Sequence, residues 1–99
     1  MKFMVTWSIP QNNWLPLNKR FISMSPEQRA NVGEGVKLVG RWFNTAARTG
    51  IAILESDSLA AVSRYLGQWN AYLDVDIAPV LDEEEAVAVA RQIAADNNA

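Results

Sequence analysis

The apolar residues of this chain follow two spacings that take turns along its length. In four stretches rich in β-branched and aromatic side chains they tend to alternate, which predicts strands over residues 2–9, 36–43, 49–55 and 72–77. Elsewhere they recur every three or four positions, which predicts helices around residues 14–24, 59–69 and 86–93. The order β-α-β-β-α-β, with a helix at the end, is that of the ferredoxin-like α+β sandwich, here as one domain over residues 1–99.

Capping and turn residues indicate where several elements begin and end. The segment Ser25-Pro26-Glu27-Gln28 has the spacing of a capping box, so a short second helical turn should follow the first helix. Ser58 is placed to cap the next helix, and Asp82 with Glu85 is placed to start the terminal one. Pro79 is expected to end the last strand, because proline has no N–H to donate to a neighbouring strand.

The topology also predicts how the sheet is covered. Four antiparallel strands should lie in the order last, first, third, second, with the two main helices on one face. Apolar residues occur on both faces of the first strand, as Phe3 and Met4 illustrate, and an apolar sheet face must be covered. We therefore expect a homodimer joined sheet to sheet, with the terminal helix packed on the body or across the partner. The apolar stripe of that helix consists of Ala86, Val89, Ala90 and Ile93.

Composition excludes several functions. The net charge is −2, whereas nucleic-acid binding requires a basic face, so no nucleic acid is expected as a partner. Histidine and cysteine are absent, which argues against zinc, haem, thiol catalysis and disulfides, and no cofactor or metal is expected. The apolar run that ends at Pro10 is too short for a membrane span or a signal peptide, so we expect a cytoplasmic protein without a membrane partner.

Two aspartates are candidates for chemistry. Asp74 and Asp76 lie two residues apart on a predicted strand and therefore share one face. If that face is enclosed, their repulsion would raise the pKa of one carboxyl and allow acid–base chemistry or binding of a hard metal ion. Alternatively the face is solvated, or the carboxylates pair with Arg41 and Lys37. We hypothesise one polar patch on this face, made of Thr6, Ser8, Arg41, Tyr72, Asp74 and Asp76.

Arginine and tryptophan supply the other candidates. Arg41 and Arg48 flank the predicted hairpin of the second and third strands, where they could bind an anionic substrate in a bidentate way or pair with carboxylates. Trp69 ends a helical stripe and is expected in the core. Trp7 and Trp42 lie on strands, and they could line an aromatic pocket or a subunit interface.

Several short motifs add a family resemblance to these patterns. They are Met4-Val5, the Gly-Val-x-x-Val-x-x-Trp of residues 35–42, Arg48, the Ile-Leu-Glu-Ser-Asp of residues 53–57, Trp69, and the segment 75–80. With them, residues 3–80 resemble a small uncharacterised bacterial family of the dimeric α+β barrel superfamily. The resemblance implies a dimer of ferredoxin-like domains. That superfamily contains cofactor-independent monooxygenases, lactone isomerases, haem enzymes and stress-responsive domains, and this chain differs from the haem members in lacking histidine.

These observations lead to one functional prediction with two alternatives. We predict a small soluble domain that binds a small organic molecule in a pocket beside the sheet of a homodimer. The alternatives are a non-catalytic homo-oligomerisation or protein-interaction module, and a cofactor-independent monooxygenase or isomerase. Whether the protein is an enzyme stays open, and no catalytic residue is assigned. The candidate binding residues are Thr6, Trp7, Ser8, Arg41, Trp42, Tyr72, Asp74 and Asp76.

Overall fold

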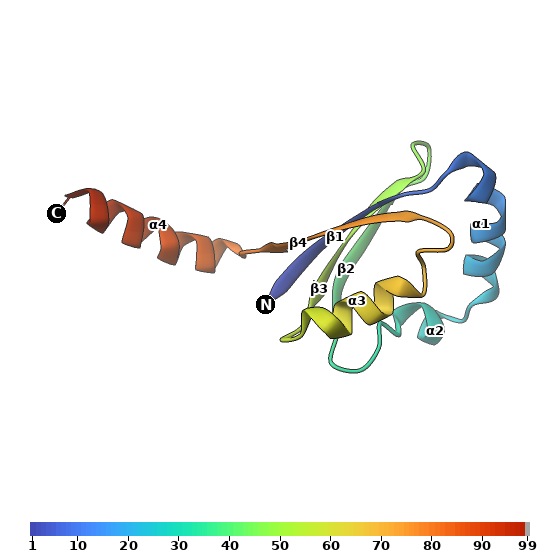
Figure 1. Ribbon diagram of the computed structural model, residues 1–99, viewed down its shortest axis with the longest axis horizontal. Helices are drawn as coiled ribbons and strands as arrows, with labels where there is room; N and C mark the ends of the chain where they lie inside the picture. Colours follow the sequence, from blue (N-terminus) through green and yellow to red (C-terminus); the bar gives the residue numbers. More distant parts are fainter. Residues whose placement is uncertain (99) are drawn as a thin grey trace.

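A computed structural model describes residues 1–98 and shows a sheet with helices packed on one side and a long helix projecting from the other end (Figure 1). The strands are β1 (Lys2–Ser8), β2 (Lys37–Asn44), β3 (Thr49–Glu55) and β4 (Asp74–Val80). The helices are α1 (Trp14–Ser23), preceded by the 3₁₀ turn η1 (Gln11–Asn13), α2 (Pro26–Ala30), α3 (Leu59–Gly67) and α4 (Glu83–Asn98). The predicted α+β ferredoxin-like fold is confirmed.

The strands of the described chain pair antiparallel in the order β2-β3-β1-β4, which is the predicted order. The prediction for the last strand was wrong at both ends, since β4 begins at Asp74 and continues through Pro79 to Val80. Pro79 lies opposite Phe3 on β1. Because β4 is an edge strand, a residue without an N–H can remain in it when its other side faces no strand.

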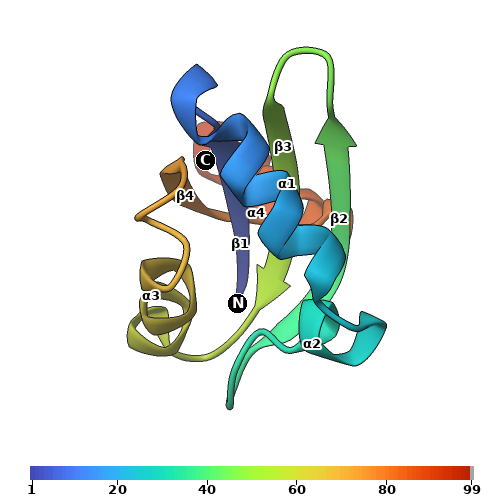
Figure 2. The same ribbon diagram turned by 90° about the vertical axis from the view of Figure 1, so that its right-hand side faces the viewer.

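One face of the sheet carries the core. Phe3 and Val5 of β1, Leu54 of β3 and Val62 of α3 are buried in a single cluster. The helices α1, α2 and α3 all lie on this side, and we call it the covered face (Figure 2). Their burial of apolar side chains against the strands is the main stabilising term for a domain of this size.

The capping predictions are confirmed. Ser25 and Gln28 form the reciprocal capping box of α2, and the hydroxyl of Ser58 accepts a hydrogen bond from the Ala61 N–H at the start of α3. At α4, the Asp82 carboxylate accepts from the Glu85 N–H at 2.8 Å, and the Glu85 carboxylate accepts from the Asp82 N–H at 3.1 Å. Each pair satisfies N–H groups that a helix start leaves without a partner.

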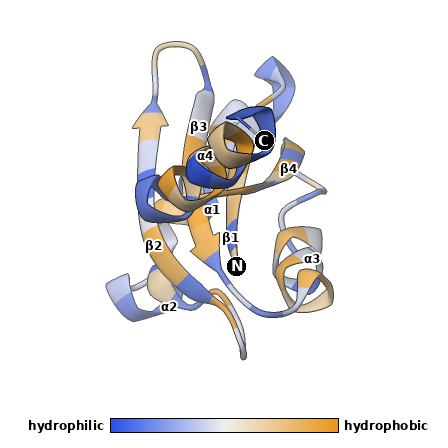
Figure 3. Cartoon of the chain, turned by 90° about the vertical axis from the view of Figure 1, so that its left-hand side faces the viewer, coloured by the Kyte–Doolittle hydropathy of each residue, from blue (hydrophilic) through white to orange (hydrophobic). Residues whose placement is uncertain are grey.

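The other side of the sheet, which we call the open face, is covered by none of the helices in the described chain. After β4 the chain passes through Leu81 into α4, which points away from the body (Figures 1 and 3). The expectation that α4 packs on its own body was wrong, because none of its side chains is buried. Its predicted apolar stripe, from Ala86 to Ile93, is exposed along the helix.

Candidate functional site: a cavity between sheet and helices

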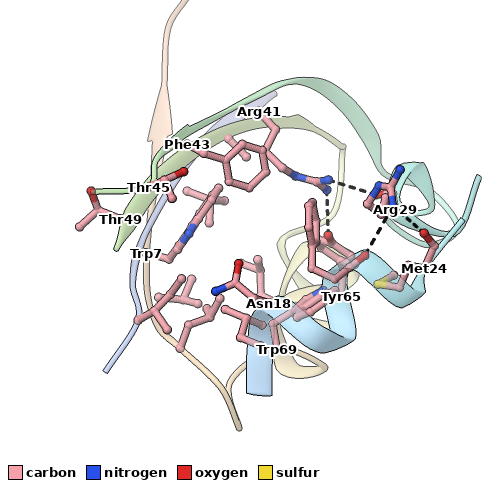
Figure 4. A pocket seen from close by; sticks show the side chains of 18 of the residues that line it. Trp7, Asn18, Met24, Arg29, Arg41, Phe43, Thr45, Thr49, Tyr65 and Trp69 are labelled. Carbon is pink, nitrogen blue, oxygen red and sulfur yellow. Dashed lines mark hydrogen bonds between the residues drawn. The ribbon is translucent and has the colours of Figure 1, made fainter. Parts of the chain in front are cut away.

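A cavity of about 350 Å³ lies between the covered face of the sheet and helices α1 and α3 (Figure 4). Its sheet side is formed by Val5 and Trp7 of β1, Ala52 of β3 and Phe43 of β2. The helices contribute mostly aromatic and aliphatic side chains. These are Trp14, Leu17, Asn18 and Phe21 of α1 and Tyr65 and Leu66 of α3, with Trp69 and Leu73 following them.

Aromatic rings from three elements form a continuous wall. The rings of Trp7 and Phe43 meet edge to face with centroids 5.8 Å apart, and Phe21 of α1 lies 5.6 Å from Phe43. Trp7 lies flat over Gly50, where an added Cβ would be 2.1 Å from the indole. Glycine at this position therefore leaves the room that the indole needs, and any larger residue would push Trp7 toward the cavity.

One cluster of polar groups, centred on Arg41, lies at one end of the cavity, while Thr45 and Thr49 lie on another side (Figure 4). The Arg41 guanidinium donates from Nη1 to the carbonyl of Arg29 and from Nη2 to the hydroxyl of Tyr65, each at 3.1 Å (Figure 4). The Arg29 side chain donates to the carbonyl of Met24 at 2.5 Å and stacks over Phe21, with its Cζ 5.4 Å from the ring centroid. The Arg41 side chain is therefore held in place by α2, through the Arg29 carbonyl, and by α3, through the Tyr65 hydroxyl.

The predicted site residues fall on both sides of the sheet. Trp7 and Arg41 line the cavity. Thr6 lies opposite Asp76 and Ser8 opposite Asp74 in the β1–β4 register, so these four side chains share the open face as predicted. Trp42 is also on the open face, where it is 58% exposed and its ring lies over Gly40.

Two members of the hypothesised polar patch lie elsewhere. Arg41 pairs with Ala52, a residue of the covered face, so it points to the side opposite Asp74 and Asp76. Tyr72 precedes β4, and its ring lies 6.4 Å from that of Trp69. Acid–base chemistry by the two aspartates inside the cavity is therefore not possible in this arrangement.

Arg48 has a structural role. It adopts a left-handed backbone conformation with φ of 56° at the end of the β2–β3 hairpin. Its Nε donates to the carbonyl of Ile9 at 3.2 Å, and its own carbonyl accepts from the Ile9 N–H at 2.8 Å. These bonds hold the end of β1 against the hairpin.

Sequence reasoning missed several residues of the cavity, above all Tyr65, Phe21, Phe43 and Asn18. Helical spacing places Trp14, Leu17 and Phe21 on one side of α1, but it does not separate residues that face a void from residues that pack. Tyr65 could have been suspected, since a phenol beside an inward stripe needs a polar partner. No group of three or more acidic side chains that could hold a metal ion occurs within residues 1–98.

The fold and the cavity define a small ferredoxin-like α+β protein with a largely aromatic pocket between the sheet and the helices. The chain belongs to the family that shares a domain of unknown function named DUF3303, whose profile matches residues 1–94. This agrees with the resemblance to a small uncharacterised family. A comparison with curated proteins finds no match.

One similar solved structure is that of a candidate antibiotic biosynthesis monooxygenase from Deinococcus radiodurans. The two chains are 12% identical, the match covers 82% of this chain and 92% of the other, and the TM-score is 0.43. No residue role transfers at this level of similarity. Separately, no helix in the described part of the chain is long and apolar enough to cross a membrane.

Proposed function

We propose that this protein binds a small, mainly apolar organic molecule in the cavity between the covered face and the helices. The observation that supports it is the cavity itself, which has a volume of about 350 Å³ and is lined mainly by aromatic and aliphatic side chains with a few polar groups. Small-molecule sites typically combine apolar walls with a few placed polar groups and have this size.

Filling the cavity tests this proposal. Ala52 is a buried residue of its sheet side, so Ala52→Leu should occupy ligand space, whereas Ala60→Leu makes the same change on the exposed side of α3. A panel of aromatic compounds would be screened by quenching of the tryptophan fluorescence, since three tryptophans line the cavity. Binding by the natural chain and by Ala60→Leu, with loss in a folded Ala52→Leu variant, is expected. Equal binding by both variants would place the ligand elsewhere.

We also propose that the protein acts as a homodimer. It exposes 7019 Å², whereas a folded monomer of 11.0 kDa usually exposes about 5600 Å². The difference, about 1400 Å², is larger than the ~800 Å² that each partner buries in a standard interface. The radius of gyration is 16.7 Å against about 13 Å for a compact domain of this length.

The open face and α4 are the surfaces that we propose a second copy covers. On the open face the apolar side chains of Met4, Ile51, Ile53 and Trp42 lie side by side across β1, β3 and β2. A second copy offers both a matching sheet face and an α4 whose stripe is free to pack. Light scattering at micromolar concentration should give twice the chain mass, and a monomer there would contradict the proposal.

A further inference from the structure

The end of the cavity at Arg41 and Tyr65 offers free hydrogen-bond donors. Arginine has five N–H groups, and Arg41 uses Nη1 and Nη2 for one bond each to Arg29 and Tyr65. The Tyr65 oxygen accepts from Arg41, and no hydrogen bond within residues 1–98 uses the hydrogen of its hydroxyl. A ligand at this point therefore meets the remaining guanidinium N–H groups and a phenol O–H.

The charged residues that line the cavity are all basic. The chain has more acidic than basic residues, with a net charge of −2. Yet the described residues that line the cavity include Arg29 and Arg41 and neither aspartate nor glutamate. The ion pairs of residues 1–98 all involve Met1 or Lys2, at the other end of β1. The positive charge of Arg41 therefore has no carboxylate partner in the part of the chain that the structure describes.

We propose that the ligand is a planar aromatic molecule with one anionic oxygen group, of which a carboxylate is the simplest form. This inference rests on the proposed function and names the class of ligand. The anionic oxygens would accept charge-assisted hydrogen bonds from the free N–H groups of Arg41 and a hydrogen bond from the Tyr65 hydroxyl. The aromatic body would lie along the wall of Trp7, Phe43 and Phe21, where edge-to-face contacts are available.

The surroundings increase the strength of this contact. Arg41 is half-buried beside apolar and aromatic side chains, where charges are screened less than in water. The two bonds to Arg29 and Tyr65 hold the guanidinium in place before a ligand arrives, so little side-chain freedom is lost on binding. The Arg29 side chain, which donates to the carbonyls of Phe21 and Met24 at the end of α1, adds its charge to the positive potential at this end of the cavity.

A matched pair of compounds tests the charge of the ligand. 1-Naphthoate and 1-naphthamide have the same ring system, and only the first is anionic. Isothermal titration of the natural chain should show the carboxylate binding at least about tenfold more tightly, as expected for a charge-assisted hydrogen bond. In Arg41→Gln this preference should disappear while naphthamide binding is kept. Tyr65→Phe, which removes only the hydroxyl, should reduce the preference several-fold.

Two controls make the outcomes distinct. Arg91→Gln removes the same charge from the exposed surface of α4 and should keep the full preference. Naphthamide binding reports whether each variant is folded, and if Arg41→Gln does not fold, the Tyr65→Phe result decides. Equal affinity of the natural chain for both compounds would overturn this inference and leave the proposed function standing. Binding of neither compound would overturn this inference and contradict the proposed function as well.

Discussion

The two faces of the sheet differ in what surrounds them, although they are built from alternate residues of the same strands. On β3, Leu54 points to the covered face and is 1% exposed, while its neighbour Ile53 points to the open face and is only partly buried. The covered face holds the core and the cavity. The open face mixes apolar side chains, such as Met4, Ile51 and Ile53, with polar ones, and none of the described helices lies over it.

This difference shows that apolar character alone does not reveal what a face packs against. The apolar side chains of the covered face pack against helices of the same chain. The cavity remains there because the aromatic rings that line it do not meet in the middle. We propose that a second copy covers the open face. The two faces therefore correspond to the two proposals, a ligand on one side and a second copy on the other.

The largest effect is expected in the core of the covered face. Leu54→Ala should lower the free energy of unfolding by about 2–5 kcal/mol per chain, because a buried leucine leaves a space that the surroundings fill incompletely. Urea denaturation followed by circular dichroism measures it. Ser63→Ala on the exposed side of α3 is the control, with an expected change within about 0.5 kcal/mol. A loss as small as that for Leu54→Ala would contradict the packing described here.

A substitution on the open face should change the strength of dimer formation. Trp42→Asp places a charge at an exposed aromatic residue and should weaken dimer formation by about 2 kcal/mol or more, as for aromatic anchors of other interfaces. Sedimentation equilibrium of the natural and variant chains measures the change. Lys19→Asp on the exposed side of α1 should leave the dissociation constant unchanged. If both variants behave alike, the open face is not the interface.

A smaller loss of stability is expected for a substitution of Arg41 on the covered face, and almost none for a substitution of Asp74 on the open face. Arg41→Ala should cost about 1–2 kcal/mol of stability, because it removes two hydrogen bonds on the covered face. Asp74→Asn should change stability by less than about 0.5 kcal/mol, since that carboxylate is exposed. The denaturant midpoint at neutral pH measures both. A large and equal loss in the two variants would indicate that Arg41 and Asp74 act as a pair.

The smallest effect concerns pH at the start of α4. The N–H of Glu85, and then the ammonium of Lys2, hold the pKa of Asp82 below its ordinary value of 3.8. The Asp82 carboxylate raises the pKa of Lys2 above 10.5. The stability that the Asp82 carboxylate contributes is therefore fully present above pH 3.8 and is lost as the pH falls through its lowered pKa. The stability that the Lys2 ammonium contributes is lost as the pH rises through its raised pKa. Both side chains are partly exposed, 29% for Lys2 and 38% for Asp82, so the change should be local.

Amide exchange in the first turn of α4 measures this effect. The Glu85 amide should exchange faster at a pH below the lowered pKa of Asp82 than at neutral pH, after correction for the intrinsic rate. Asp82→Asn, which can still cap a helix, should remove most of this pH dependence. An unchanged dependence in Asp82→Asn would show that another group titrates there.

Much of the fold could be predicted because the local signals agree with the packing. Alternation, capping boxes and the element order all indicate the same sandwich. The prediction was wrong for the last strand because residues 70–73 continue the turn after α3, where the N–H groups of Tyr72 and Leu73 both donate to the carbonyl of Trp69. Such a turn has no distinctive sequence pattern, and Tyr72 has the side chain of a strand residue.

The candidate site was harder to predict because one irregularity in β2 turns the residues after it to the opposite face of the sheet. The β2–β3 register shifts between Leu38 and Gly40, and Arg41 therefore lies opposite Ala52. In a regular strand Arg41 would lie opposite Ile51 on the open face, beside the set in which it was expected. The partner Tyr65 comes from α3, so the cavity depends on contacts distant in sequence that no local pattern specifies.

The edges of the sheet have a consequence for how this protein avoids uncontrolled aggregation. A bare edge strand can recruit further strands and grow into fibrils. Here β4 presents Pro79 and the exposed aspartates at 74 and 76, and β2 is interrupted by its bulge. Proline, charge and bulges are the features that make an edge a poor template. Open-ended growth along the strand-pairing direction is thus disfavoured, whereas the face-to-face association that we propose would close after two copies.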